Sequence, residues 1–227
     1  MLFESTPTEL RFIATPEKGA VSALLMRPAG ATHLLVLGHG ASTNMRHATL
    51  QNIAERLFEV GIATFRYNFP YSENGRGRDS QATCTATVRA AAAAARASAP
   101  DLMLLAGGHS FSGRMTSTAA SQASLENVRG LIFFSFPLHP AGESATTRAD
   151  HLSSINIPML FLSGSRDALA ELDLLQPVVK SLGKLASLHL LDTSDHSYKV
   201  LKKTRQSDED IFVEIARSVR DWALALK

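Results

Sequence analysis

The stretch LMLLAGGHSFSGRM, residues 102–115, decides how the rest of the chain is interpreted. It begins with a short apolar run, continues through two adjacent glycines to Ser110, and ends in a polar segment that can form a helix. A short apolar run that ends at glycine is typical of a strand buried on both faces of a sheet. The pattern therefore predicts a strand that is followed at once by a helix, with Ser110 at the turn between them.

The residues around Ser110 resemble the nucleophile elbow, G-x-S-x-G, in which a sharp strand-to-helix turn exposes a serine hydroxyl at the carboxyl edge of a sheet. Here the sequence is GHSFS, residues 108–112, so Ser112 replaces the second glycine. Serine is nearly as small as glycine, and Gly113 follows directly, so the close approach of strand and helix remains possible. Ser112 is a poor rival nucleophile, because the bulky Arg114 would occupy the small position in its own register. The alternative is that Ser110 only caps the helix.

Length and composition narrow the class of protein. A chain of 227 residues is within the range of one large α/β domain, and we expect a single domain over residues 1–227. The formal net charge is +2 and the basic residues are scattered, which predicts no nucleic-acid partner. Cys84 is the only cysteine, which excludes an internal disulfide and a cysteine-based metal cluster. Since no targeting segment or bilayer-length apolar run is recognisable, we expect a cytoplasmic protein that does not contact membranes.

Apolar and amphipathic segments alternate along the chain. Two early strands, at residues 10–14 and 21–26, flank a turn and predict a hairpin. Further strands are expected at 34–37, 62–67, 130–136, 158–162 and 188–191, and helices around 50–57, over 84–99, after Ser110 and from Ser207, where Asp210 adds a capping-box pair. This order predicts an α/β fold with a mostly parallel sheet, helices on both faces, and ligands at the carboxyl edge of the strands.

Two further loops at that edge carry residues that can activate a serine hydroxyl. His196, in DTSDH after the last predicted strand, is the candidate base, and Asp167, in GSRD after strand 158–162, is the candidate carboxylate. A serine hydroxyl is a weak nucleophile without a base, and the base needs a carboxylate to orient its ring. The chain order Ser110, Asp167, His196 is the order found in α/β-hydrolases.

Each of these residues has a simpler interpretation when taken alone. A histidine after a strand is more often structural than catalytic, and Asp167 can merely cap a turn. Asp192 and Asp195 are alternative acids, although Asp195 adjoins His196 in sequence and neighbouring residues seldom orient one another. Most of the other seven histidines are expected to have structural roles only: His33, His47 and His151 at surface or loop sites, and His189 within a strand.

Acyl transfer also needs donors for the oxyanion of the tetrahedral intermediate. We expect these donors to be the N–H groups of Phe111 and of Ala41, which follows the His39-Gly40 turn. The side chains expected to line the substrate pocket are His39, His139, Arg114 and Tyr71.

Six segments carry a resemblance to a known family: GHGAS (38–42), FRYNFPYSENGRGR (65–78), GGHSFSGRM (107–115), FPLHPAG (136–142), GSRD (164–167) and SDHSYK (194–199). From about Val21 onward the chain resembles the α/β-hydrolase superfamily. Within it, the chain is most similar to small, lidless members. These include dienelactone-hydrolase-like proteins and the hydrolase-like domain of the third regulatory subunit of the NSL acetyltransferase complex.

The resemblance implies a serine-hydrolase triad of Ser110, Asp167 and His196, with no cofactor and no metal. Dienelactone hydrolases use cysteine as the nucleophile, so the serine here weighs against that substrate. Residues 137–157 leave room for a short helix at most, hence for no substantial lid. We expect cleavage of a small carboxylic ester or thioester through an acyl-enzyme on Ser110. The alternatives are a catalytically silent protein-interaction module, or an acyltransferase or peptidase that uses the same triad; the oligomeric state is not predicted.

Overall fold

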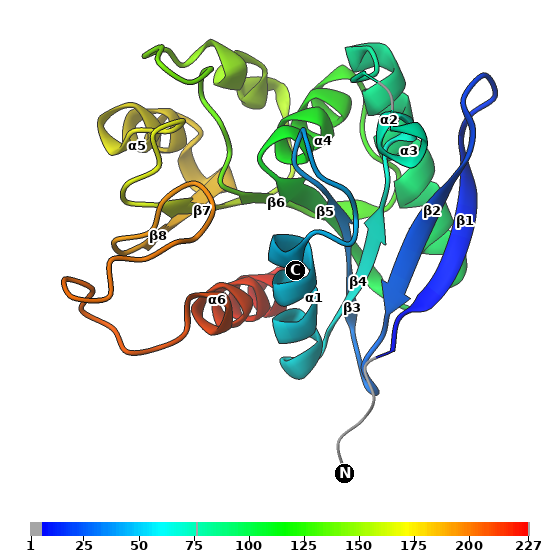
Figure 1. Cartoon of the computed structure of the whole chain (residues 1–227), viewed down its shortest axis with the longest axis horizontal. Coiled ribbons are helices and arrows are strands. Elements are labelled where there is room, and N and C mark those ends of the chain that lie inside the picture. The colour runs from blue at the N-terminus through cyan, green and yellow to red at the C-terminus, as the bar shows by residue number, and fades with distance from the viewer. Residues whose placement is uncertain (1–5, 76, 227) are drawn as a thin grey trace.

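The two N-terminal strands form the expected hairpin at one edge of a sheet. In the computed structural model, which describes residues 6–75 and 77–226, this sheet has eight strands in the order β1-β2-β4-β3-β5-β6-β7-β8 (Figure 1). The β1–β2 and β2–β4 pairs are antiparallel, and the other five pairs are parallel. The strands are β1 (Thr8–Thr15), β2 (Gly19–Met26), β3 (His33–Gly38), β4 (Ile62–Tyr67), β5 (Met103–His109), β6 (Val128–Phe134), β7 (Met159–Gly164) and β8 (Ala186–Leu191).

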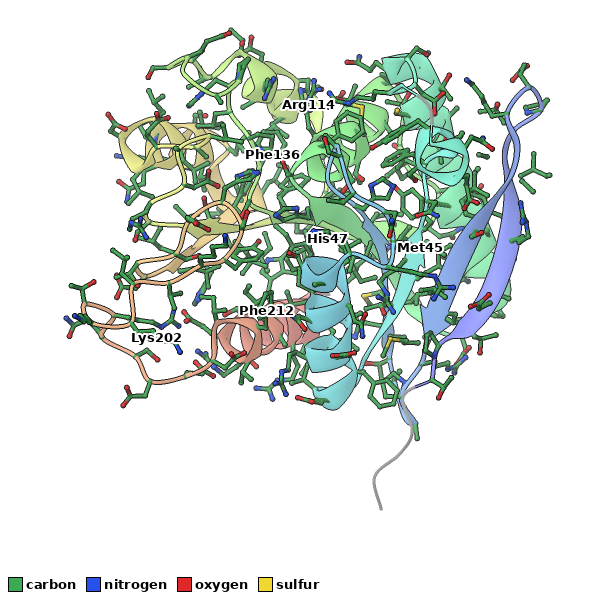
Figure 2. All side chains as sticks on the ribbon, in the orientation of Figure 1. Met45, His47, Arg114, Phe136, Lys202 and Phe212 are labelled. Atoms are coloured by element: carbon green, nitrogen blue, oxygen red, sulfur yellow. The ribbon has the colours of Figure 1, made fainter. Side chains whose placement is uncertain are left out.

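Helices cover both faces of the sheet, as predicted. Figure 1 shows α1 and α6 on one face, and α3, α4 and α5 on the other. Figure 2 shows the same division in side chains, with Phe212 on the α6 side and Arg114 on the α4 side. The helices are α1 (Ala48–Glu59), α2 (Pro70–Asn74), α3 (Gln81–Ser98), α4 (Phe111–Gln122), α5 (Leu172–Ser181) and α6 (Ile211–Ala225), with short 3-10 helices at Thr147–Ser154 and Gly183–Leu185.

The central strands supply both apolar layers of the core. All six residues of β3 are buried, and their side chains alternate between the faces: Leu34 and Val36 join the α3 layer, and Leu35 and Leu37 join the α1 and α6 layer. Full burial of each such side chain contributes about 1.5–3 kcal/mol relative to exposure. This explains why β3 is continuously apolar in sequence rather than alternating.

Two helices lie where the sequence pattern gave no helix. Short α2 lies within the segment interpreted as a loop, with Pro70 at its first position, where proline is tolerated. Helix α5 lies between the last two strands, and its interior Pro177 obscures the helical pattern. The start of the last helix was also predicted too early, because α6 begins at Ile211 and Asp210 caps it.

The carboxyl edge of the sheet is open. Between β6 and β7 the chain forms only the 3-10 helix Thr147–Ser154, in line with the expectation of no substantial lid. Within residues 6–75 and 77–226, no helix combines the length and the apolar character needed to cross a membrane. The loops after β3, β5, β7 and β8 therefore meet at an edge that no long insertion covers.

Candidate active site

Ser110 lies between β5 and α4 in a strained backbone conformation. Its φ is 52° and its ψ is −110°, a combination that residues other than glycine rarely adopt. The Ser110 N–H donates to the Phe134 carbonyl at 2.8 Å, so the neighbouring strand holds the turn in place. The Ser110 side chain makes no capping hydrogen bond to α4, which rules out the interpretation of Ser110 as a helix cap.

The elbow tolerates Ser112 because glycines surround it. A Cβ atom on Gly108 would lie 2.1 Å from the Ser112 Oγ, and one on Gly38 would lie 2.5 Å from the Ser112 Cβ. Ser112 is fully buried, and its hydroxyl donates to the His109 carbonyl at 3.1 Å. The side chain that replaces the second elbow glycine is thus accommodated by glycines at the ends of two adjacent strands, β3 and β5.

A chain of hydrogen bonds links Ser110 to Asp167 through His196. The His196 Nε2 lies 2.8 Å from the Ser110 Oγ, and its Nδ1 lies 2.9 Å from both carboxylate oxygens of Asp167. Since a carboxylate can only accept at Nδ1, that nitrogen carries the proton and Nε2 is left free to accept from the serine hydroxyl. The geometry is that of a serine with a base in place and a carboxylate behind the base.

The loops after β7 and β8 are held together closely enough to align this pair. A Cβ atom on Gly164 would lie 2.2 Å from the Ser194 carbonyl oxygen, and that carbonyl accepts from the Arg166 N–H at 2.9 Å. The Asp167 carboxylate is inaccessible to solvent and also accepts from the Leu169 N–H at 2.9 Å. The site therefore depends on long-range contacts between two loops that are separated in sequence.

The alternative acids have other partners. Asp195 accepts from the N–H groups of Ser197 and Lys199, and Asp192 accepts from the Gln206 N–H. The structure thus brings Asp167, and neither of the other two, to His196.

The turn after β3 is fixed by His39. The Phe69 N–H donates to the His39 Nε2 at 3.2 Å, so the ring proton lies on Nδ1, which donates to the Gly40 carbonyl at 2.7 Å. Burial lowers the pKa of His39 to about 4, which keeps the ring neutral. In a trans peptide the carbonyl and the following N–H point in opposite directions, so this bond also sets the direction of the Ala41 N–H.

Phe111 is the first residue of α4, where backbone N–H groups have no acceptor within the helix. The aligned peptide dipoles of the helix add partial positive charge at the same end. This terminus lies directly beside the Ser110 hydroxyl, where it can stabilise a developing negative charge.

The comparisons with known proteins agree with this architecture. The sequence profile of the alpha/beta hydrolase domain family matches residues 31–224. The chain is an α/β-hydrolase. A dienelactone hydrolase from Anabaena variabilis is similar in structure, with a TM-score of 0.76, 16% sequence identity, and coverage of 97% of this chain and 99% of that one.

Two other solved structures are similar at comparable levels. A serine hydrolase without a lid from Xanthomonas campestris has a TM-score of 0.71 and 19% identity, with 98% of this chain and 97% of that one covered. Est1E from Butyrivibrio proteoclasticus has a TM-score of 0.70 and 16% identity, with 95% and 97% covered. At these identities, the likeness establishes the fold that the α/β-hydrolase family match already indicates.

The four predicted pocket side chains occupy different environments in this α/β-hydrolase. His39 and His139 are fully buried, and Tyr71 is nearly so, whereas Arg114 is half-buried. His139 binds the Glu171 carboxylate and the Pro140 carbonyl; burial opposes protonation of this ring, but the two hydrogen bonds outweigh it and raise its pKa. Tyr71 lines a surface pocket together with Ala41, so these two lie at the same opening.

Helix α4 of this α/β-hydrolase contributes a further serine–histidine contact. The Ser117 Oγ lies 2.7 Å from the His151 Nε2, between α4 and the 3-10 helix Thr147–Ser154. His151 is half-buried rather than at the surface position expected for it, and His33, at the start of β3, is buried as well. Ser117 is inside α4, with no exposed surface, so its hydroxyl is not presented to a substrate.

Sequence reasoning did not single out His109, the residue between the elbow glycine and Ser110. The His109 Nε2 lies 3.1 Å from the His196 backbone carbonyl and donates to it, and the two rings are 5.5 Å apart. Burial and the neighbouring His196 lower the pKa of His109 to about 4, so it stays neutral. The bond ties the His196 loop to the elbow of this α/β-hydrolase. The only signal for His109 was its place in the elbow motif.

Proposed function

We propose that this α/β-hydrolase is a serine hydrolase that cleaves small carboxylic esters or thioesters through an acyl-enzyme on Ser110, within a single domain. The observation that carries the proposal is the hydrogen-bonded chain from Asp167 through His196 to a serine held in a strained turn. Strain of this kind costs on the order of 1–3 kcal/mol and persists where the surrounding structure enforces it.

In the proposed reaction, the Ser110 Oγ attacks the acyl carbonyl carbon while the His196 Nε2 takes the hydroxyl proton. Asp167 holds the ring and stabilises its positive charge. The N–H groups of Ala41 and Phe111 bind the oxyanion of the tetrahedral intermediate, and each such donor contributes about 2.7–4 kcal/mol to transition-state stabilisation.

Collapse of the intermediate breaks the bond to the alcohol or thiol, which leaves with the proton from His196. A water molecule then attacks the ester on Ser110, His196 takes its proton, and that proton returns to the Ser110 Oγ as the carboxylic acid is released. Each proton that leaves a nucleophile is thus returned to a leaving group, and no cofactor is needed.

Labelling with a fluorophosphonate probe tests the nucleophile without knowledge of the substrate, because the probe reacts with a serine activated by its own base and oxyanion donors. Peptide mass spectrometry should locate one adduct, on Ser110, and the Ser110→Ala variant should give none. Ser117→Ala is the matched control, since it removes another histidine-bonded serine and should still be labelled on Ser110.

Absence of an adduct on a folded wild-type protein would favour a catalytically silent interaction module. If labelling succeeds, the acyltransferase and peptidase alternatives are tested by product analysis. Transfer of the acyl group to an added alcohol in preference to water would indicate a transferase, and cleavage of peptides without cleavage of esters would indicate a peptidase.

A further inference from the structure

Two arginines flank the residue that follows the proposed nucleophile. The Arg78 Cζ lies 4.9 Å from the centroid of the Phe111 ring, and the Arg114 Cζ lies 6.0 Å from it. Arg78 comes from the loop after α2 and Arg114 from the first turn of α4, one turn past Ser110. Two cations from separate segments thus converge on the ring beside Ser110, at the positive end of a 12-residue helix.

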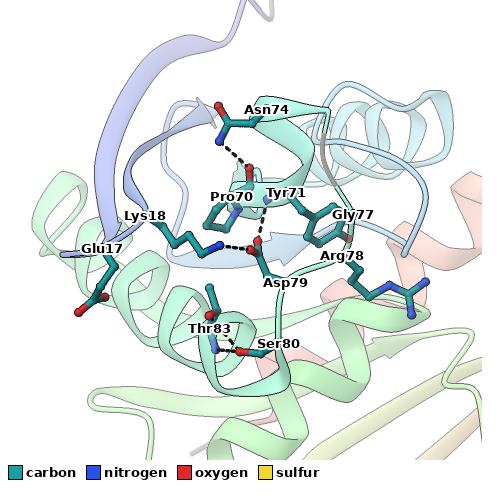
Figure 3. A pocket seen from close by; sticks show the side chains of 10 residues that line it. All are labelled: Glu17, Lys18, Pro70, Tyr71, Asn74, Gly77, Arg78, Asp79, Ser80 and Thr83. Carbon is teal, nitrogen blue, oxygen red and sulfur yellow. Dashed lines mark hydrogen bonds and ion pairs between the residues drawn. The ribbon is translucent and has the colours of Figure 1, made fainter.

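Neither guanidinium has an acidic partner among the residues that the structure describes. Within residues 6–75 and 77–226, no acidic side chain forms an ion pair with Arg78 or Arg114. Asp79, the nearest carboxylate in sequence, accepts instead from Lys18 and from the Tyr71 N–H, both at 2.7 Å. Figure 3 shows this arrangement, with Asp79 directed to Lys18 and the Arg78 side chain extending away from both.

A third arginine increases the local positive charge. Arg148, at the start of the 3-10 helix that packs on α4, donates to the His139 carbonyl at 2.8 Å. Burial lowers the pKa of Arg114, and the positive charges of Arg148 and Arg78 lower it further. Like charges held together in a partly buried position are unfavourable without a counter-charge, so the arrangement favours binding of an anion.

A pocket extends from the proposed oxyanion turn to Arg78. Its walls include Ala41, Thr43, Tyr71, Ser72 and Arg78, so one opening leads from the Ala41 backbone to the Arg78 guanidinium. The Tyr71 hydroxyl is buried and has no hydrogen-bond partner among the described residues. A second polar group of a substrate bound at the Ala41 turn can therefore reach Arg78, and Arg114 lies near the same Phe111 ring.

We propose that Arg78 and Arg114, with Arg148 behind them, form a subsite for an anionic group of the substrate, a carboxylate or a phosphate. This proposal rests on the proposed function and narrows it from small esters and thioesters in general to anionic ones. A guanidinium binds either group through two parallel charge-assisted hydrogen bonds, so the shared chemistry is that of a planar or tetrahedral oxyanion.

Two matched substrate pairs distinguish the position of the charge. The para-nitrophenyl monoester of adipic acid and para-nitrophenyl hexanoate have acyl chains of equal length, and only the former carries a terminal carboxylate. Acetyl-coenzyme A and the acetyl thioester of N-acetylcysteamine share the acyl group and the thioester, and only the former carries phosphates. We expect kcat/KM for the anionic member of one pair to exceed that of its neutral partner by about tenfold or more.

The variants Arg78→Gln and Arg114→Gln should each lower that ratio by about tenfold, and added salt should lower it in the wild type. Arg27→Gln is the matched control, since it removes the same charge from an exposed pair with Asp101 at the opposite edge of the sheet. The control should leave the ratio unchanged. Because Arg78 is exposed, its variant remains informative if Arg114→Gln does not fold.

A ratio below about threefold for both pairs, or a ratio that both arginine variants retain, would overturn the anionic subsite while leaving the serine hydrolase intact. Binding provides a readout that does not require turnover. By calorimetry, Ser110→Ala should bind the monoethyl ester of adipic acid more tightly than ethyl hexanoate, and additional substitution of Arg78 should abolish the difference. If no ester or thioester is cleaved but this difference persists, the subsite stands and the proposed reaction fails.

Discussion

Two serine–histidine hydrogen bonds of nearly equal length lie along α4, one at the residue before the helix and one within it, and the two differ in almost every other respect. The Ser110–His196 contact is 2.8 Å and the Ser117–His151 contact is 2.7 Å. Ser110 precedes the helix, with a positive φ at an open edge, whereas Ser117 is in the regular helix and has no exposed surface. A short serine–histidine distance is thus insufficient to indicate a nucleophile.

The second difference is the partner of each histidine ring on the side away from the serine. Asp167 contacts the Nδ1 of His196 at 2.9 Å, whereas within the described part of the chain no carboxylate forms a hydrogen bond or ion pair with the His151 ring. The Ser117 hydroxyl donates to the Arg114 carbonyl of its own helix at 2.9 Å, so its proton is already engaged. Burial, and to a lesser degree Arg114, lower the pKa of His151. The second pair has the geometry of a helix-packing contact.

The largest expected difference between the pairs is in turnover. Ser110→Ala should lower kcat for ester hydrolysis by about 10⁴-fold or more, because the covalent route is lost and only binding and oxyanion stabilisation remain. Ser117→Ala should retain kcat within about threefold, since it removes only two buried hydrogen bonds, each worth about 1 kcal/mol of stability. Steady-state kinetics on both variants, with urea unfolding to confirm the fold, provide the measurement.

Equal loss of kcat in the two serine variants would contradict the distinction. A Ser110→Ala protein that still turns over by an acyl-enzyme would eliminate Ser110 as nucleophile, and a silent Ser117→Ala variant with normal stability would transfer the role to the second pair.

The next largest effect concerns the carboxylate. Asp167→Asn should lower kcat by about 10⁴-fold, because an amide can donate to Nδ1 and so place the His196 proton on the wrong nitrogen. Asp150→Asn is the matched change beside His151, where the aspartate is exposed and acts only through its charge. It should leave kcat within about twofold. A mild effect of Asp167→Asn would indicate that His196 keeps its tautomer by other contacts.

The smallest expected effect is on the stability of the fold, and it concerns His39, which is proposed to hold the Ala41 turn rather than to react. Burial holds the pKa of His39 at about 4, below the ordinary value of 6.5. Between these pH values the unfolded chain binds a proton that the folded chain does not, so the free energy of unfolding falls as the pH decreases. The full shift corresponds to about 3 kcal/mol.

His39→Asn should remove this contribution. Urea unfolding at pH 7.5 and pH 4.5 should therefore show a smaller loss of stability on acidification in the variant than in the wild type. Equal losses would mean that His39 is protonated in the folded protein at pH 4.5, and hence that its Nε2 does not accept from the Phe69 N–H.

Much of the fold could be predicted because its signals are local. Only a few adjacent residues are needed to recognise the continuous apolar run of β3 and the glycine-bounded run of β5. The early hairpin is also formed by residues that are close in sequence. The two helices that were not predicted have local sequence signals that are interrupted or too short. Pro177 interrupts the pattern of α5, and the single turn of α2 is too short to show a period.

The candidate site divides in the same way. Ser110, Asp167 and His196 could be selected because each follows a strand, and parallel strands bring their carboxyl ends to one edge. The environment of His39 could not be predicted, because the sequence His-Gly is the same whether the histidine ring lines a pocket or is fully buried beneath a turn. Only the packing of the Phe69 backbone against its ring decides this.

By itself, the sequence determined the α/β fold with a mostly parallel sheet, the turn that carries Ser110, and the order in which serine, aspartate and histidine occur. These depend on periodicity and on small residues at fixed spacing. The tertiary structure decided which aspartate meets His196, which of the histidines is buried, and which arginines gather at Phe111. Such contacts join residues far apart in the chain, and their energies depend on distance and burial, which no local pattern encodes.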